Sequence, residues 1–239
     1  RELVLTLLNK GAKVAAVDLN EKGLHETFAL SGKNKKLSLH TINISDQEAV
    51  NGLVEQVIAY HGQVDGIINC AGIVQPFIDV DAMDMEKINR VINVNFYGTL
   101  YMTKAFLPVL KKRPEAHIAN VSSMGGFFPV PGQSIYGASK AAVKLLTEAL
   151  YAELSETNVG VSVVIPGGIA TNIMTNSDIG TKTAGMDAKG VRLLLTPNRT
   201  AKLIISCIEK NKFRMFIGKD AKLFNIIYKF KPKLAIKLM

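Results

Sequence analysis

Short runs of apolar residues alternate along the chain with longer stretches in which apolar residues recur every three or four positions. The short runs are rich in Val and Ile and lack a polar face, which is typical of parallel strands buried on both sides. They occupy residues 13–18, 37–42, 64–69, 117–122, 159–166 and 213–218. The longer stretches predict helices near residues 45–62, with Ser45 as its N-cap, 85–113, 136–156 and 200–210. This alternation predicts an α/β fold, a doubly wound parallel sheet with helices on both faces, in a single domain over residues 1–239.

The two ends of the chain depart from this regular pattern. The first residues, RELVLTLLNKGAK, read as a helix that ends at Gly11 before the first strand. Residues 219–239 form a basic amphipathic extension. Its apolar residues recur at the spacing of one helix face: Leu223, Ile226, Ile227, Phe230 and Leu234. Residues 210–239 contain nine Lys or Arg and one Asp, so much of the net charge of +9 lies here. Such a helix can make a peripheral contact with an anionic membrane, or it can be a lid or dimer-packing helix with a solvated basic side, which we favour.

Composition narrows the class of protein. Hydrophobic residues make up 48% and charged residues 21%, as in ordinary globular domains, and no apolar run is long enough to span a bilayer. Cys70 and Cys207 are too few for a disulfide framework, and the four histidines have no metal-ligand spacing. We therefore expect reduced thiols in a cytoplasmic protein, and no metal site. We also expect no nucleic-acid partner, because no groove-reading motif accompanies the basic charge.

One segment, NVSSMGGFFPVPGQSIYGASKAA, carries a hydroxyl, a phenol and an amine that suit proton transfer. Tyr136 and Lys140 stand four residues apart, so both leave the same face of a helix that starts near Tyr136. A cationic amine favours the phenolate, which would lower the pKa of Tyr136 from its usual value of about 10. Ser123 follows a predicted strand thirteen residues earlier and can face the helix start across a cleft.

Four motifs in this order resemble those of the short-chain dehydrogenase/reductase family. They are NCAG at residues 69–72, NVNFYG at residues 93–98, NVSS followed by YGASKAAV, and PGGIAT at residues 166–171. The resemblance covers residues 13–175 and implies a Rossmann fold and an oxidoreductase that transfers a hydride between NAD and an alcohol or ketone. It implies Tyr136 as catalytic acid or base, Lys140 beside it, Ser123 at the substrate oxygen, and Asn95 as a residue that opens its helix and connects Lys140 to solvent. Asn93 is the competing candidate, and the register of the motif favours Asn95.

The same resemblance assigns residues to the cofactor, most of them at the carboxyl ends of predicted strands, where ligands of such sheets bind. Asp18 can accept hydrogen bonds from both ribose hydroxyls of the adenosine and would repel a 2′-phosphate, which favours NAD over NADP. Asn43 stands where the family has an Asp that contacts adenine, with its amide oxygen as the acceptor and Ile44 as an apolar wall. The other cofactor-binding residues implied are Asn69, Ala71, Gly72, Tyr136, Lys140, Pro166, Gly167, Ile169 and Thr171.

One family motif is absent from the sequence. Dinucleotide-binding members begin with a strand and a glycine-rich turn, Thr-Gly-x-x-x-Gly-x-Gly, whose N–H groups hold the pyrophosphate. The chain opens on the helix that follows this turn. We therefore expect a first strand and a phosphate loop to precede Arg1 in the parent protein.

The substrate is the least determined part of the interpretation. Ser123 and the segment after it are expected to line the substrate mouth through Gly125, Phe127, Phe128 and Val130, although these Phe residues are equally suited to packing at a subunit interface. Residues 173–190 are expected to form a lid, and the expected substrate is an apolar, lipid-like or steroid-like alcohol or ketone. Apolar helices over residues 85–112 and 136–156 predict a homodimer or homotetramer. The alternative function is a non-catalytic dinucleotide-binding sensor or scaffold, which has no need of the complete Ser123, Tyr136 and Lys140 set.

Overall fold

The computed structural model describes residues 1–177 and 194–237 of the 239-residue chain. Within them, the apolar runs form the strands β1 (Val14–Asp18), β2 (Leu37–Thr41), β3 (Gly66–Asn69), β4 (Ala116–Val121), β5 (Val159–Pro166) and β6 (Arg214–Ile217). β1 pairs with β2, and the other strands form a sheet in the order β3-β4-β5-β6. Every ladder is parallel, so the carboxyl ends of the strands in each sheet lie at one edge.

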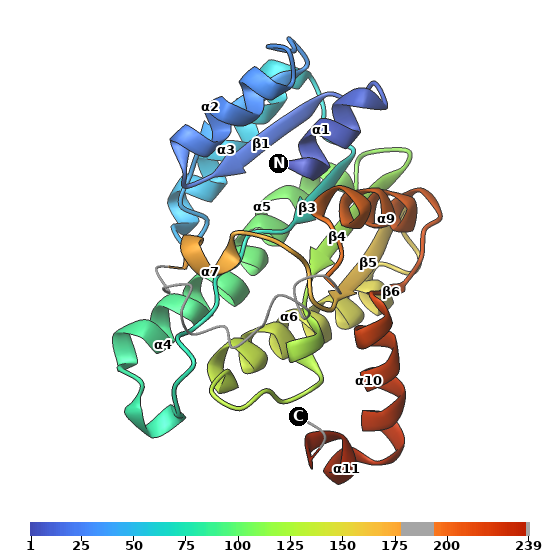
Figure 1. Ribbon diagram of the computed structural model, residues 1–239. Helices are drawn as coiled ribbons and strands as arrows, with labels where there is room; N and C mark the ends of the chain where they lie inside the picture. Colours follow the sequence, from blue (N-terminus) through green and yellow to red (C-terminus); the bar gives the residue numbers. More distant parts are fainter. Residues whose placement is uncertain (178–193, 238–239) are drawn as a thin grey trace.

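Helices lie on both faces of these strands (Figure 1). One face is covered by α3 (Gln47–His61), α5 (Gly98–Leu110) and α6 (Ser134–Glu153), whose Leu53, Phe106 and Leu150 share a buried cluster with β3, β4 and β5. The other face carries α1 (Glu2–Asn9), α2 (Glu21–Leu30) and α9 (Pro197–Glu209). The remaining helices are α4 (Met85–Ile92), α7 (Ile173–Asn176), α10 (Lys219–Phe230) and α11 (Pro232–Lys237). The predicted doubly wound α/β domain is confirmed.

β1 shares a core with the four-stranded sheet, although no ladder joins β1 to β3 within the described residues. Ala15 and Val17 of β1 pack against the cluster that contains Ile67 of β3, while Val14 and Ala16 pack with α1 and α2. Strand side chains alternate between faces, so this division places β1 between two helical layers.

The start of α3 differs from the sequence expectation by one residue. Asp46, rather than Ser45, is the N-cap, and its Oδ1 accepts the N–H groups of Glu48 (3.0 Å) and Ala49 (3.1 Å). The Ser45 hydroxyl donates instead to Asn43. Both Ser and Asp suit this position, so the pattern alone does not choose between neighbours.

The basic extension is two helices, where the spacing of its apolar residues predicts one. Lys231 leaves the helical conformation (φ −140°, ψ 67°) immediately before Pro232. The residue before a proline is pushed out of the α region by the proline ring, which explains the break. Leu234 therefore belongs to α11 and not to α10. In residues 1–177 and 194–237, no helix is both long enough and apolar enough to cross a membrane.

Candidate active site

Three of the four predicted catalytic residues come from the end of β4 and the start of α6. Ser123 lies just beyond β4, and its Oγ accepts the Gly125 N–H (3.1 Å). α6 begins at Ser134, so Tyr136 lies in its first turn and Lys140 one turn later on the same face, as their spacing predicts. The neighbouring Ser122 joins the two elements, because its buried Oγ donates to the Lys140 carbonyl (2.7 Å).

The Lys140 amine is buried beside this edge of the sheet. The residue is 4% exposed, and its Nζ donates to the carbonyl of Val121 (3.1 Å). Burial lowers the pKa of Lys140 to about 8, because the charged amine loses its hydration. A Cβ added to Gly72 would stand 3.0 Å from Nζ and 3.2 Å from Asn95 Oδ1. Gly72, Asn95 and Lys140 therefore meet at one point, where only glycine leaves room.

The Tyr136 phenol behaves differently from the expectation drawn from its spacing to Lys140. Burial raises the pKa of Tyr136, and the hydrogen bond with the Ser123 side chain offsets part of that rise. Burial costs an ionised phenolate more hydration free energy than this hydrogen bond restores. The predicted net lowering of the Tyr136 pKa is therefore wrong in this structure. The contact with Ser123 does confirm that the predicted strand end and helix start meet.

Asn95 lies in a π-helical turn, Asn93–Tyr97, between α4 and α5. It is fully buried, its Oδ1 accepts the Ile73 N–H (2.8 Å), and its Nδ2 donates to the Ile73 carbonyl (2.9 Å) and to Ser139 Oγ (2.9 Å). Ser139 Oγ donates in turn to the Tyr136 carbonyl (2.7 Å). Such turns are rare within helices and frequent at functional sites. The expected local opening of the helix is thus observed at Asn95, whereas the competing Asn93 is exposed.

Gln75 holds the first turn of α6, although no motif of the sequence points to it. It is fully buried, and its Oε1 accepts the N–H groups of Ile135 and Tyr136, each at 2.8 Å. Its Nε2 donates to the Gly132 carbonyl (2.9 Å), and its own carbonyl accepts from Gln133 Nε2 (2.8 Å). The first N–H groups of a helix have no partner within the helix, and the N-cap residue Gln133 caps none of them with its side chain. Gln75 supplies that acceptor from a distant loop and so fixes the backbone of Tyr136.

Of the residues expected at the adenosine, Asp18 is the last residue of β1, and Asn43 and Ile44 follow β2. Asp18 is exposed, and its Oδ1 accepts the Asn20 N–H (3.0 Å). Asn43 differs from the expectation, because its Oδ1 accepts both the N–H (3.1 Å) and the hydroxyl (2.6 Å) of Ser45. An amide oxygen has two lone pairs, so the predicted acceptance of an adenine amino group does not hold in this arrangement. Nδ2, a donor, is the group that Asn43 can offer a ligand.

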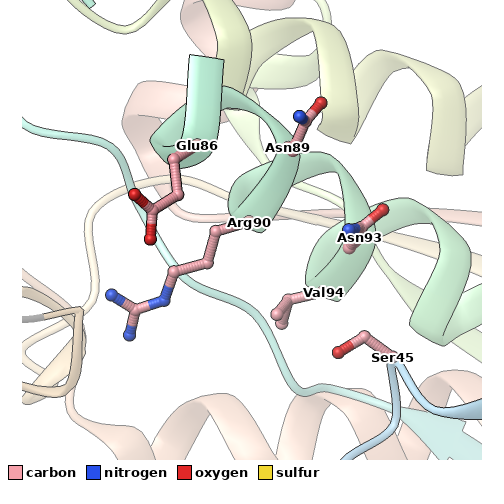
Figure 2. A pocket seen from close by; sticks show the side chains of 6 residues that line it. All are labelled: Ser45, Glu86, Asn89, Arg90, Asn93 and Val94. Atoms are coloured by element: carbon pink, nitrogen blue, oxygen red, sulfur yellow. The ribbon is translucent and has the colours of Figure 1, made fainter. Parts of the chain in front are cut away.

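Ile44 packs against the start of α5. A Cβ added to Gly98 would stand 2.6 Å from Ile44 Cδ1, so the side chain lies on a glycine backbone. A shallow depression of about 380 Å³ adjoins this region, and its lining is Ser45, Glu86, Asn89, Arg90, Asn93 and Val94. In Figure 2 these side chains extend from α4, from the π-helical turn and from the loop after β2. The depression lies at the expected adenosine side and is not lined by Ser123, Tyr136 or Lys140.

Asn69 turns its side chain into the core, which corrects its predicted role as a group that contacts the cofactor. It is 9% exposed, and its Nδ2 donates to Asn120 Oδ1 (2.8 Å) and Thr103 Oγ1 (3.3 Å). Asn120 Nδ2 donates onward to Thr147 Oγ1 (3.0 Å). These buried side chains join β3, β4, α5 and α6 beneath the site. Asn69 therefore supports the turn that contains Ala71, which is exposed, and Gly72.

The PGGIAT segment leaves β5 at Pro166 and is tied to the C-terminal helix α10. The Gly168 N–H donates to Asp220 Oδ2 (2.7 Å) in the first turn of α10, and a Cβ added to Gly167 would collide with the same carboxylate. Ile169 forms a parallel bridge with Leu195, and Thr171 is exposed. Asp220 is a second residue that no motif indicates, and it positions the loop that the resemblance assigns to the cofactor.

The two phenylalanines expected at the substrate mouth have different surroundings. Phe128 is fully buried, with its ring centre 4.7 Å from that of Phe224 and 5.7 Å from that of Tyr228 on α10. Its predicted contact with substrate is therefore wrong, because it packs the loop against α10. Phe127 is half-buried, with its ring centre 5.8 Å from that of Phe216.

For the other residues predicted to line the substrate mouth, contact with substrate stays a prediction. A Cβ added to Gly125 would stand 3.2 Å from the Tyr136 ring, which places the Gly125 backbone beside the phenol. Val130 is half-buried. Of the predicted lid over residues 173–190, only residues 173–177 are described, and the rest lies outside the described residues.

Comparisons with known proteins agree with these motifs. The family model described as short chain dehydrogenase matches residues 1–182. SadH of Mycobacterium tuberculosis (strain H37Rv), whose name assigns it provisionally to the oxidoreductases, is 35% identical over 237 residues, which span 95% of this chain and 84% of SadH.

Two solved structures resemble this fold at lower identity. A short-chain dehydrogenase/reductase from Burkholderia phymatum in complex with NAD has a TM-score of 0.85 at 22% identity, over 97% of this chain and 90% of that one. The protein ElxO with NADP bound has a TM-score of 0.78 at 22% identity, over 91% of both chains. At this identity the likeness concerns the fold, which accommodates either dinucleotide in those proteins.

Proposed function

The chain belongs to the short-chain dehydrogenase/reductase family, and on this premise we propose that it is an oxidoreductase that transfers a hydride between NAD and an apolar alcohol or ketone. One observation carries the proposal. Ser123, Tyr136 and Lys140 meet at the end of β4 and the start of α6, with the buried Asn95 bonded to the same helix. A fold alone would not support a reaction, but this set of a hydroxyl, a phenol and a buried amine suits proton transfer.

The described residues fit a nicotinamide dinucleotide. The Lys140 amine has three donors, and Val121 accounts for one of them, which leaves capacity for ribose hydroxyls. Gly72 keeps the space against this amine clear of a side chain, and Asp18 presents an exposed carboxylate at the end of β1. When bound, the cofactor supplies or accepts the hydride.

In this proposal each side chain has a separate task. Tyr136 donates a proton to the substrate oxygen during reduction and accepts it during oxidation. Ser123 hydrogen-bonds the same oxygen as negative charge develops there. Lys140, cationic below its pKa of about 8, offers its remaining donors to the ribose hydroxyls of the cofactor, and Asn95 fixes the α6 backbone through Ser139.

The proposal is tested by assaying the full-length protein with NAD against primary and secondary alcohols of increasing apolar length. Formation of NADH is followed by absorbance, and the reverse reaction with the matching aldehydes and ketones gives the preferred direction. We expect turnover that improves with the apolar surface of the substrate. Tight binding of NADH without turnover on any alcohol or ketone would favour the sensor over the enzyme.

Cofactor preference provides a prediction that depends on Asp18. We expect kcat/KM to be higher with NAD than with NADP, and Asp18→Ala to narrow that ratio by about tenfold, because an exposed carboxylate no longer repels a 2′-phosphate. Asp18→Asn should act alike, since it removes the charge and keeps the acceptor for Asn20. Asp79→Ala, at an exposed carboxylate on another loop, is the matched control. Equal efficiency of the unmodified enzyme with both cofactors would contradict the assignment.

A second prediction concerns Gln75 as a positioning residue. Gln75→Ala should lower kcat by about 10- to 100-fold and change the Kd for NADH by less than about twofold, because the Tyr136 backbone loses its acceptor while the cofactor contacts remain. Gln75→Glu should recover part of the loss at neutral pH, since its carboxylate accepts the same N–H groups at a helix N-terminus but cannot donate to the Gly132 carbonyl. Gln63→Ala, at an exposed glutamine, is the control. If both Gln75 variants lost kcat equally and also bound NADH more weakly, Gln75 would contribute to folding and not to the position of Tyr136.

A further inference from the structure

The helix α10 has an apolar face toward the protein and another that points away from it. Ala221 is buried, and Phe224 and Tyr228 pack against Phe128. Leu223, Ile226 and Phe230 are 55%, 56% and 73% exposed. Their spacing of three and four residues places them in one stripe on the side of the helix opposite to the packed residues.

The helix α11 extends this apolar surface, and lysines surround it. Leu234 and Ile236 are 46% and 45% exposed, whereas Ala235 between them is buried. The exposed lysines of the two helices and their connection are Lys219, Lys222, Lys229, Lys231, Lys233 and Lys237. Lys229 Nζ lies 5.7 Å from the ring centre of Phe230, so a cation adjoins the most exposed aromatic ring of the stripe. In Figure 1 both helices extend from β6 away from the sheets.

We propose that this outward surface, formed by the apolar stripe and the lysines of α10 and α11, rests on anionic lipid membranes. An amphipathic helix with large apolar side chains and flanking lysines lies in the interface plane, with its apolar side chains among acyl chains and its amines at the phosphates. Lysine stems can reach the headgroups while the stripe is immersed. Helices of 12 and 6 residues are too short to cross a bilayer, so the contact proposed for α10 and α11 is peripheral.

Charge favours a membrane over a second copy of the chain as the occupant. A two-fold contact through this surface would bring lysines of one copy toward lysines of the other, with Asp220 as the single acidic residue of the two helices. The Asp220 carboxylate already accepts the Gly168 N–H. An exposed apolar stripe among uncompensated lysines is therefore complementary to a surface that is both apolar and anionic.

The inference stands apart from the proposed reaction, because it concerns binding of the protein and not turnover. It is tested by sedimentation of the full-length protein with vesicles of phosphatidylcholine alone or of an equimolar mixture with phosphatidylglycerol. We expect at least about tenfold stronger binding to the anionic vesicles at low salt, weakening as salt screens the lysines.

Two variants separate the apolar and the charged contributions. The triple variant L223S/I226S/F230S should lose about tenfold in binding by removing the stripe, and K222E/K229E should lose at least as much together with the salt dependence. Leu30→Ser, at a 62% exposed leucine of α2, and Lys35→Glu, at an exposed lysine, are the matched controls and should bind like the wild type. Circular dichroism and light scattering verify the folding and the oligomeric state of each variant.

Binding of the triple variant equal to that of the wild type, or binding of the wild type to neither kind of vesicle, would overturn the proposal. A triple variant that forms smaller oligomers than the wild type, with no vesicle binding by either, would overturn it in favour of a contact between copies. Binding of wild type and K222E/K229E alike to both kinds of vesicle would also contradict the assignment of an anionic surface.

Discussion

Replacing Tyr136 by phenylalanine in the full-length protein should lower kcat by about a thousandfold and leave the Kd for NADH within about twofold of the wild type. Gln75 and Ser139 hold the backbone of Tyr136, so the substitution keeps the ring in place and removes only the hydroxyl. Absorbance of NADH measures turnover, and its fluorescence measures affinity. Tyr151→Phe, at a 44% exposed tyrosine of the same helix, is the matched control and should keep wild-type kcat. A Tyr136→Phe enzyme with more than about a tenth of wild-type kcat would exclude Tyr136 as the acid or base.

Replacing Lys140 by methionine should abolish most turnover and at the same time stabilise the protein without cofactor. The pKa of about 8 against an ordinary 10.5 corresponds to a cost of about 3 kcal/mol for burying the charged amine at neutral pH. Losing the hydrogen bond to the Val121 carbonyl costs about 1 kcal/mol, so we expect the free energy of unfolding to rise by about 2 kcal/mol. Lys144→Met, which removes an ion pair with Glu148 on the same helix, should give no such gain.

The pH dependence of that stability difference has a defined sign. Below pH 8 the amine is protonated in both states, so the wild type carries the full cost of burial. Between about pH 8 and 10.5 the folded protein loses the proton first, so wild-type stability rises with pH and the advantage of Lys140→Met shrinks. Urea unfolding at several pH values measures the difference. An advantage that stays constant up to pH 10.5 would mean that charge burial is not its cause.

The pattern of residues within short segments was sufficient to predict the strands, the helices and much of the candidate site. Tyr136 and Lys140 share a helix face because of spacing alone, and Ser123 could be placed near them because a strand end and a helix start were both legible in the sequence. Asn95 was identified from its place in the NVNFYG motif, and the structure supplies Ile73 and Ser139 as the partners that a buried amide needs. These are properties of short segments, which sequence periodicity reports directly.

The residues that sequence reasoning missed act across long separations. Gln75 caps a helix about sixty residues away, and Asp220 binds a glycine fifty-two residues before it, so neither has a signature in its own segment. Phe128 was misassigned for a related reason: an apolar residue in the sequence does not reveal whether it contacts substrate or packs against a helix such as α10. Asn43 is different: the Ser two positions later was visible in the sequence, and such side chains commonly bond to each other and to the local backbone.

The hydrogen bond from Gly168 to Asp220 has a thermodynamic consequence for the whole protein. It joins the loop at the end of β5 to the helix that carries the outward surface. If a ligand stiffens this loop, its binding also favours one orientation of α10, because the loop and the helix are joined. Thermodynamic linkage then requires that an event which fixes the orientation of α10 changes the affinity for that ligand. Occupancy at the loop and attachment at α10 would then alter each other's dissociation constants by the same factor, although the two places share no ligand. Asp220→Asn keeps an acceptor but removes the charge. We expect it to change this coupling factor more than it changes either dissociation constant measured separately.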